Sequence, residues 1–216
     1  MYIMSLKKLS CTLFLLASIV SSSAFASLFG NDEPDSKVLG LAIKAYNTAA
    51  KQGLIDNAGI LTIIDYSLPS TSNRLFVIDL DHNNKVLFST LVAHGKGSGE
   101  NFATHFSNSA RTLTSSLGVF LTENTYSGKH GYSLKIKGLE NGFNDRAESR
   151  TIVIHPAEYV SKGTIRTLGR LGRSWGCPAL EPEVSKPIID TIKNGSLIFA
   201  YANDRTWLNK SRFLHS

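Results

Sequence analysis

Between residues 60 and 154 the chain alternates short apolar runs with turn-forming residues, and this pattern restricts the fold more than any other feature of the sequence. Runs rich in β-branched and aromatic residues lie at 61–66, 74–80, 85–93, 118–122, 132–137 and 150–154, with a last one at 196–201. Runs of this length and composition, separated by polar turn residues, are typical of β-strands. The turn at 81–84 joins the second and third runs. We therefore expect a mainly β domain.

Helical patterns flank this β region. Residues 37–52 have an apolar stripe among good helix formers and are followed by Gly53, which predicts an amphipathic helix. Residues 181–193 have Pro182 in the first turn and Gly195 just past the end, the positions that these two residues favour at helix ends. The segments 95–116 and 138–149 are rich in glycine, serine and asparagine. We expect them to be long loops, which in a compact domain often carry function.

The first 26 residues have the three parts of a signal peptide. Lys7 and Lys8 precede an apolar run, and Ala24-Phe25-Ala26 forms an Ala-x-Ala cleavage site. The run is too short for an ordinary transmembrane helix. We expect cleavage after Ala26, a periplasmic or secreted protein, and no stable membrane insertion afterwards. The predicted organisation is a signal peptide at 1–26, an N-terminal helical segment at 27–59 and a catalytic domain at 60–216.

Charge gives only weak guidance about partners. The formal net charge of the sequence is +6 and falls to +4 when residues 1–26 are removed, because that segment holds Lys7, Lys8 and no acidic residue. A mild basic excess suits a carboxylate-bearing polymer, but many proteins with neutral partners are equally basic. No basic run is interleaved with aromatic residues, so we expect no nucleic-acid binding.

The chain has two cysteines, and only Cys177 lies outside the predicted signal peptide. A single thiol cannot form an intramolecular disulfide, and in an oxidising compartment it is exposed to oxidation. Gly176 and Pro178 flank it, which favours a formed turn. We predict that Cys177 is a nucleophile; the alternative is a buried cysteine that packs as a small apolar residue.

Positive charge near the sulfur supports the catalytic interpretation. Arg170 and Arg173 precede Cys177 in the sequence, and cationic neighbours lower the pKa of a thiol and so favour the nucleophilic thiolate. We expect these two arginines to make the surroundings of the sulfur electropositive.

A nucleophilic cysteine also needs a base, and histidine is the usual one near neutral pH. His94 and His155 each stand where an apolar strand ends and a loop begins, and the pattern alone does not separate them. His155 is closer to Cys177 in the sequence, so two neighbouring strands and one connection could bring it beside the thiol. We favour His155 on this ground.

The order of His155, a glycine-rich connection and then Ser174-Trp175-Gly176-Cys177 resembles the signature of YkuD-type L,D-transpeptidases. The resemblance is strongest to murein L,D-transpeptidase catalytic domain proteins and extends over nearly all of the chain after the signal peptide. The matching segments are 61–80, 91–95, 106–108, 115–118, 126–134 and 169–180. Two positions depart from the wider family: Pro156 follows the histidine where glycine is usual, and Trp175 stands where histidine is frequent.

The resemblance implies a β-sandwich or open barrel with a few peripheral helices, in which Cys177 begins a loop that leads into the last helix. It implies Cys177 as nucleophile and His155 as base. The turn around Gly176 and Trp175, together with the backbone of Cys177, would supply N–H donors to an oxyanion. Candidates for substrate contacts are Arg173, Ser174, Tyr132 and His94.

The reaction implied by the resemblance is cysteine-dependent acyl transfer on peptidoglycan stem peptides, with release of D-alanine and formation of a 3→3 cross-link. Two alternatives stay open. The same residues would serve a peptidoglycan hydrolase, either an L,D-carboxypeptidase or an enzyme that cleaves links between protein and murein. A catalytically silent envelope-binding module is the other. No cofactor is implied, and the sequence has no His-Glu-x-x-His or paired Cys-x-x-Cys pattern that would predict a zinc site.

Overall fold

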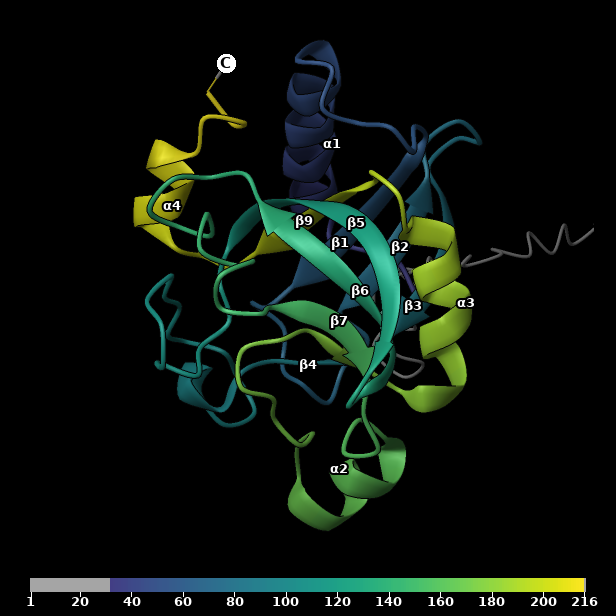
Figure 1. The fold of residues 1–216 in the computed structure, drawn as a ribbon, viewed down its shortest axis with the longest axis vertical. Helices are drawn as coiled ribbons and strands as arrows, with labels where there is room; N and C mark the ends of the chain where they lie inside the picture. Colours follow the sequence, from purple (N-terminus) through teal and green to yellow (C-terminus); the bar gives the residue numbers. More distant parts are fainter. Residues whose placement is uncertain (1–31, 216) are drawn as a thin grey trace, which may run out of the picture.

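The computed structural model describes residues 32–215, which form a mainly β domain (Figure 1). The strands are β1 Ile60–Asp65, β2 Leu75–Asp79, β3 Lys85–Thr90, β4 Val92–Ala93, β5 Gly118–Gly128, β6 Gly131–Gly138, β7 Val153–Pro156, β8 Ala179–Leu180 and β9 Leu197–Tyr201. The α-helices are α1 Ser36–Lys51, α2 Lys162–Leu168, α3 Pro182–Ile192 and α4 Arg205–Lys210, and a short 3₁₀ helix, η3, covers Lys96–Ser98.

The sheet is nearly closed on itself. Its nine strands follow the order β3-β2-β1-β9-β5-β6-β7-β8-β4. The two outermost strands, β3 and β4, are consecutive in the chain and are separated only by Leu91. Because one residue spans little more than 3 Å, the two edges of the sheet must approach each other at this point. The expected open barrel is therefore confirmed.

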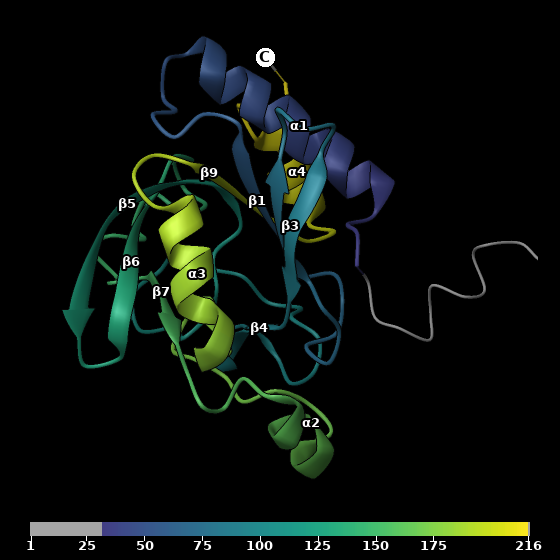
Figure 2. The same cartoon turned by 90° about the vertical axis from the view of Figure 1, so that its right-hand side faces the viewer.

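Helices α1 and α3 complete the hydrophobic core. Asp35 caps α1 by accepting hydrogen bonds from the backbone N–H groups of Lys37 and Val38, and the helix packs on β1 and β9. Helix α3 lies between the β5–β7 part of the sheet and the β1–β3 part (Figure 2). Its apolar side chains, Ile188, Ile189 and Ile192, are fully buried in the same core.

The helices expected at 37–52 and 181–193 are confirmed within one or two residues, and all the expected strands are present with shifted ends. The run 85–93 is divided at Leu91 into β3 and β4, and the last strand before His155 begins at Val153 and not at residue 150. Helices α2 and α4 were not expected. Because α4 follows β9, the helix after Cys177 is not the last one, which corrects that expectation.

The predicted signal peptide lies outside the described residues. The division of the remaining chain at residue 60 stays a prediction, although buried side chains of α1 belong to the same core cluster as the strands. Within residues 32–215, no helix combines the length and the apolar character that a membrane span requires.

Candidate active site

Strand pairing brings His155 and Cys177 together. Strands β7 and β8 are parallel neighbours, with His155 paired to Ala179. Extending this register by two residues places Cys177 beside Val153. The connection between the two strands, residues 157–178, contains α2 and the turn that carries the cysteine. The sequence argument for His155, which relied on two neighbouring strands and one connection, therefore corresponds to the observed topology.

Both residues line one surface cavity of about 660 Å³. Arg173, Ser174 and Trp175 line it as well. Gly176, Tyr132 and His94 do not. The cavity walls also include residues that the sequence analysis did not single out, namely Ala110, Arg111, Leu113, Tyr126, Lys129, His130, Arg150, Thr151, Ile152, Val153 and Tyr159.

Ser174 and Gly176 shape the turn that carries the thiol. The Ser174 hydroxyl accepts a hydrogen bond from the Gly176 N–H at 3.0 Å and donates one to the Cys177 carbonyl at 2.6 Å. Gly176 has φ of +130°, and a Cβ atom there would lie 2.8 Å from the Thr114 carbonyl oxygen. Only glycine fits this backbone without strain. Ser174, expected as a substrate contact, has its hydroxyl engaged within the turn.

The same hydrogen bond alters the expected oxyanion site. Because the Gly176 N–H already donates to Ser174, it is not free for an oxyanion. The backbone N–H groups of Val153 and, to a smaller extent, Cys177 lower the thiol pKa. Of the N–H groups of the turn itself, that of Cys177, and not that of Gly176, therefore acts on the thiol.

The side chain of Cys177 is half-buried. Its sulfur donates a hydrogen bond to the Thr151 carbonyl at 3.7 Å. Burial raises the thiol pKa above its usual value of 9.0, against the opposing effects of the Val153 backbone and the Arg150 guanidinium. Burial disfavours the charged form of a thiol, so the neutral thiol predominates near pH 7. The thiol could act as a nucleophile only if a base removed its proton.

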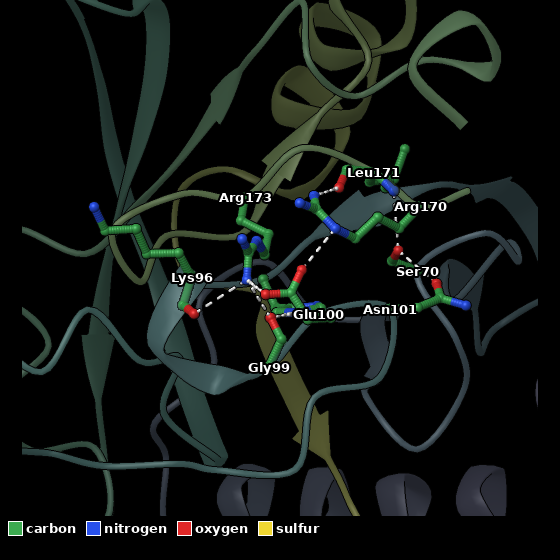
Figure 3. Close-up of polar contacts among 9 residues, drawn as sticks. Ser70, Lys96, Gly99, Glu100, Asn101, Arg170, Leu171 and Arg173 are labelled. Carbon is green, nitrogen blue, oxygen red and sulfur yellow. Dashed lines mark hydrogen bonds and ion pairs between the residues drawn. The ribbon is translucent and has the colours of Figure 1, made fainter. Parts of the chain in front are cut away.

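The arginines that were expected to activate the thiol serve another partner (Figure 3). The Nε of Arg170 and an Nη of Arg173 contact the two oxygens of the Glu100 carboxylate at 2.8 and 2.7 Å. Arg173 also donates to the Gly99 carbonyl at 2.9 Å. The expectation that Arg170 and Arg173 lower the thiol pKa is not supported, because both are paired with Glu100 and neither is among the groups that act on the sulfur.

Arg150 is the cation that acts on the sulfur. Its guanidinium donates to the Ser107 carbonyl at 2.7 Å, the Ser116 hydroxyl at 2.6 Å and the Thr114 carbonyl at 2.6 Å. These bonds tie the long loop before β5 to the cavity wall. The sequence analysis missed Arg150, although it stands immediately before the apolar run that ends in His155, and this position was the available signal.

His155 is oriented by the backbone of the next residue. Its Nδ1 lies 2.9 Å from the Pro156 carbonyl oxygen. Because a carbonyl only accepts, Nδ1 carries the proton in this contact and the lone pair of the neutral ring is on Nε2. His155 is buried, with 3 % of its surface exposed, and burial lowers its pKa. A neutral imidazole can accept the thiol proton.

His94 occupies a different environment. It is buried, its Nδ1 accepts from the Arg74 guanidinium at 2.8 Å, and its Nε2 contacts the Gly99 carbonyl at 3.3 Å. Burial first, and the charge of Arg74 second, lower its pKa to about 4. His94 is therefore a neutral internal residue and does not reach the cavity.

The two aromatic candidates also differ in place. The hydroxyl of Tyr132 donates to Asp190 on α3 at 2.7 Å, and Lys186 lies over its ring, so Tyr132 contacts a helix and not the cavity. Trp175 is 74 % exposed at the cavity rim, with the Lys96 ammonium 5.8 Å from its ring centre. Over residues 32–215, no three His, Cys, Asp or Glu side chains gather as a metal site would require.

Comparisons with known proteins identify one family. A family model described as L,D-transpeptidase catalytic domain matches residues 31–201. A search of curated proteins gave no match. Similar solved structures include an L,D-transpeptidase from Mycobacterium smegmatis, with 13 % identity, a TM-score of 0.40, and coverage of 67 % of this chain and 59 % of that one.

A second similar structure is an L,D-transpeptidase from Stackebrandtia nassauensis, with 18 % identity, a TM-score of 0.39, and coverage of 76 % of this chain and 68 % of that one. A third is a fused Zn-dependent amidase/peptidase/peptidoglycan-binding domain-containing protein from Clostridium acetobutylicum, with 19 % identity, a TM-score of 0.41, and coverage of 78 % and 63 %. The match to the Mycobacterium smegmatis protein thus spans about three fifths of that protein's length.

Proposed function

This chain belongs to the family of L,D-transpeptidase catalytic domains, and we propose that it transfers acyl groups between peptidoglycan stem peptides through Cys177. The observation that carries the proposal is that one cavity is lined by His155 on β7 and by Cys177 in the turn just before β8, the parallel neighbour of β7. A thiol and an imidazole in this arrangement are the two groups that nucleophilic acyl transfer requires.

In the acylation step, His155 accepts the proton of the Cys177 thiol while the sulfur attacks the amide carbonyl between the third stem residue and the terminal D-alanine. The hydrogen bond from Nδ1 to the Pro156 carbonyl leaves Nε2 available as the acceptor. The tetrahedral intermediate collapses as the C–N bond breaks. The imidazolium returns the proton to the leaving D-alanine amine, and a thioester remains on Cys177.

In the second step, the side-chain amine of another stem attacks the thioester. His155 takes a proton from this amine and returns it to the sulfur, which gives a 3→3 cross-link and the free thiol. Arg150 supports both steps because its positive charge faces the sulfur and would stabilise negative charge that develops there. The backbone N–H of Cys177 is the proposed oxyanion donor.

Water could replace the amine as acceptor, and the product would then be a tripeptide. The chain would act in that case as an L,D-carboxypeptidase. The residues needed for acylation are the same, so the acceptor alone distinguishes the two reactions. We also propose, from the sequence of residues 1–26, that the protein acts in the periplasm or outside the cell, where peptidoglycan lies.

The test is mass spectrometry of muropeptides after tetrapeptide-bearing murein is incubated with the protein or with Cys177→Ala. We expect 3→3 dimers with the protein and none with the variant. Tripeptide without dimer, again dependent on Cys177, would assign hydrolysis. Identical products from both proteins would overturn the cysteine mechanism. Circular dichroism of Cys177→Ala controls for the fold.

A further inference from the structure

The hairpin formed by β5 and β6 reaches the catalytic cavity with its tip. Gly128 pairs with Gly131 at its end, so Lys129 and His130 form a two-residue loop. Gly131, which follows the loop, has φ of +78°, a left-handed conformation that glycine adopts freely. Both loop residues line the cavity, and Gly131 lies against Pro156, the residue that follows His155.

At this tip, His130 stacks on His155. The two ring centres are 4.5 Å apart and the ring planes are inclined by 30°. Offset-stacked aromatic rings at this separation attract each other beyond their simple burial. His130 is exposed and has no part in the proton transfers of the proposed reaction, so this contact has no role in the mechanism described above.

The contact restrains a part of the ring that the hydrogen bond does not reach. The hydrogen bond from Nδ1 of His155 to the Pro156 carbonyl fixes one edge of the ring. Stacking by His130 restrains the face of the ring. An edge and a face together define where Nε2 points, which matters because proton transfer depends strongly on alignment.

We propose that His130 is a positioning residue that holds the His155 imidazole in register with Cys177, and that the β5–β6 hairpin delivers it. This inference rests on the proposed function, in which His155 is the base. It assigns a task to a residue that contacts the ring of His155 and takes no part in the proton transfers. Stacking needs an aromatic ring at position 130 but not an ionisable one.

The test compares His130→Ala, which removes the ring, with His130→Phe, which keeps a ring without nitrogen atoms. The control is His82→Ala, because His82 pairs with Asp79 in the turn between β2 and β3 and does not line the cavity. The steady-state release of D-alanine from a tetrapeptide gives kcat and KM. The Cε1–H signal of His155 in a ¹H–¹³C NMR spectrum, assigned by its loss in His155→Asn, reports on the stacked ring.

We expect His130→Ala to lower kcat by roughly two- to tenfold, the range that a stacking contact is worth, with KM little changed. The His155 signal should lose the upfield shift caused by the neighbouring ring. His130→Phe should restore both. Unchanged kcat and signal in His130→Ala would overturn the proposal, and so would a rise in KM alone or equal losses in the Ala and Phe variants.

The design separates this inference from the proposed function. If the unmodified protein releases no D-alanine, the proposed function fails, and the rate of Cys177 alkylation by iodoacetamide replaces kcat. Slower alkylation in His130→Ala, with recovery in His130→Phe, would still support positioning of His155 against the thiol. The positioning role of His130 would be overturned if all variants were alkylated at the same rate and the His155 signal had the same chemical shift in each of them.

Discussion

Arg74 donates a hydrogen bond to Nδ1 of His94 at 2.8 Å, inside the protein and away from the cavity that His155 and Cys177 line. Three further hydrogen bonds from Arg74 go to the carbonyls of Leu68 and Val92. His94 is thus one acceptor in the shell around a fully buried guanidinium. Its neutral form is required there, because a protonated ring would face the charge of Arg74. His94 and His155 therefore have separate tasks, one in the fold and one in the cavity.

We first predict that the loss of His155 reduces activity far more than the loss of His94. His155→Ala should lower kcat by about 10²- to 10⁴-fold, which is the usual effect of losing a general base, and should leave the fold intact. His94→Ala should weaken the reaction only a few-fold and lower the free energy of unfolding by about 2 kcal/mol, because a donor of Arg74 loses its acceptor. D-alanine release and urea unfolding measure the two effects. The reverse ranking in activity would identify His94 as the base.

His94 should also make the fold sensitive to acid. Its pKa is about 4 in the folded protein, below the ordinary value of 6.5, so the unfolded chain binds the proton more readily. Stability is then lost as the pH falls from 6.5 towards 4, by up to about 3 kcal/mol. Urea unfolding between these pH values should show the loss. In His94→Gln, which is less stable at pH 7, this part of the pH dependence should disappear; an unchanged slope would contradict the assignment.

A third prediction concerns the thiol. Because burial raises the pKa of Cys177 above 9.0, the thiolate is under about 1 % of the protein at pH 7. The rate of alkylation by iodoacetamide should rise about tenfold for each pH unit and should reach no plateau below pH 9. Mass spectrometry of samples quenched at successive times gives the rate of alkylation. A plateau near neutral pH would instead indicate a preformed thiolate–imidazolium pair.

Arg150 and Arg173 form a matched pair for testing which guanidinium affects the sulfur. Arg150→Met should slow alkylation at pH 8 by about three- to tenfold, since a nearby positive charge stabilises the thiolate. Arg173→Met should leave the rate unchanged, because Arg173 is paired with Glu100. Equal effects of both substitutions would restore the role that the sequence suggested for Arg173. Arg150→Lys should recover part of the rate but not all the hydrogen bonds.

The turn at Gly176 allows a fifth prediction. Gly176→Ala should destabilise the protein by about 1–3 kcal/mol and abolish activity, because the backbone has φ of +130° and the new Cβ would meet the Thr114 carbonyl at 2.8 Å. The control is Gly40→Ala, an exposed glycine of α1 with open space around it. This change should stabilise the helix by about 1 kcal/mol. Thermal unfolding distinguishes the two, and a neutral Gly176→Ala would refute the argument.

Much of the fold could be read locally. The strand runs and the helices α1 and α3 follow from hydrophobic period, caps and prolines, which depend on residues close in the sequence. Helices α2 and α4 were not predicted, because they are only seven and six residues long and so too short to show a periodic pattern. The break at Leu91 was not predicted either, because the run 85–93 contains no strand-breaking residue. In the structure, β3 before Leu91 and β4 after it lie at the two opposite edges of the sheet.

The candidate site was predicted in its motif but not in its electrostatics. The sequence indicated Cys177, the glycine at its turn and the pair of histidines at strand ends. The sequence analysis assigned the positive charge near the thiol to Arg170 and Arg173. Both of these arginines form ion pairs with Glu100, which is some seventy residues away in the chain. Nothing in the local pattern shows that contact. His130 was matched only as part of a family segment, and its ring reaches His155 through the length of a hairpin.

The sequence by itself determined that the domain is mainly β, that it belongs with L,D-transpeptidase catalytic domains and that Cys177 lies in a tight turn. Only the tertiary structure decided between the two histidines. Strand β8 lies between β7 and β4. Its residue Ala179 is paired with His155 on β7 and with Ala93 on β4. His94 follows Ala93, so alternation along the strand turns its ring to the opposite face. Both histidines lie near β8, the strand that follows Cys177. Long-range strand pairing sets the direction of each side chain, and only His155 points into the cavity.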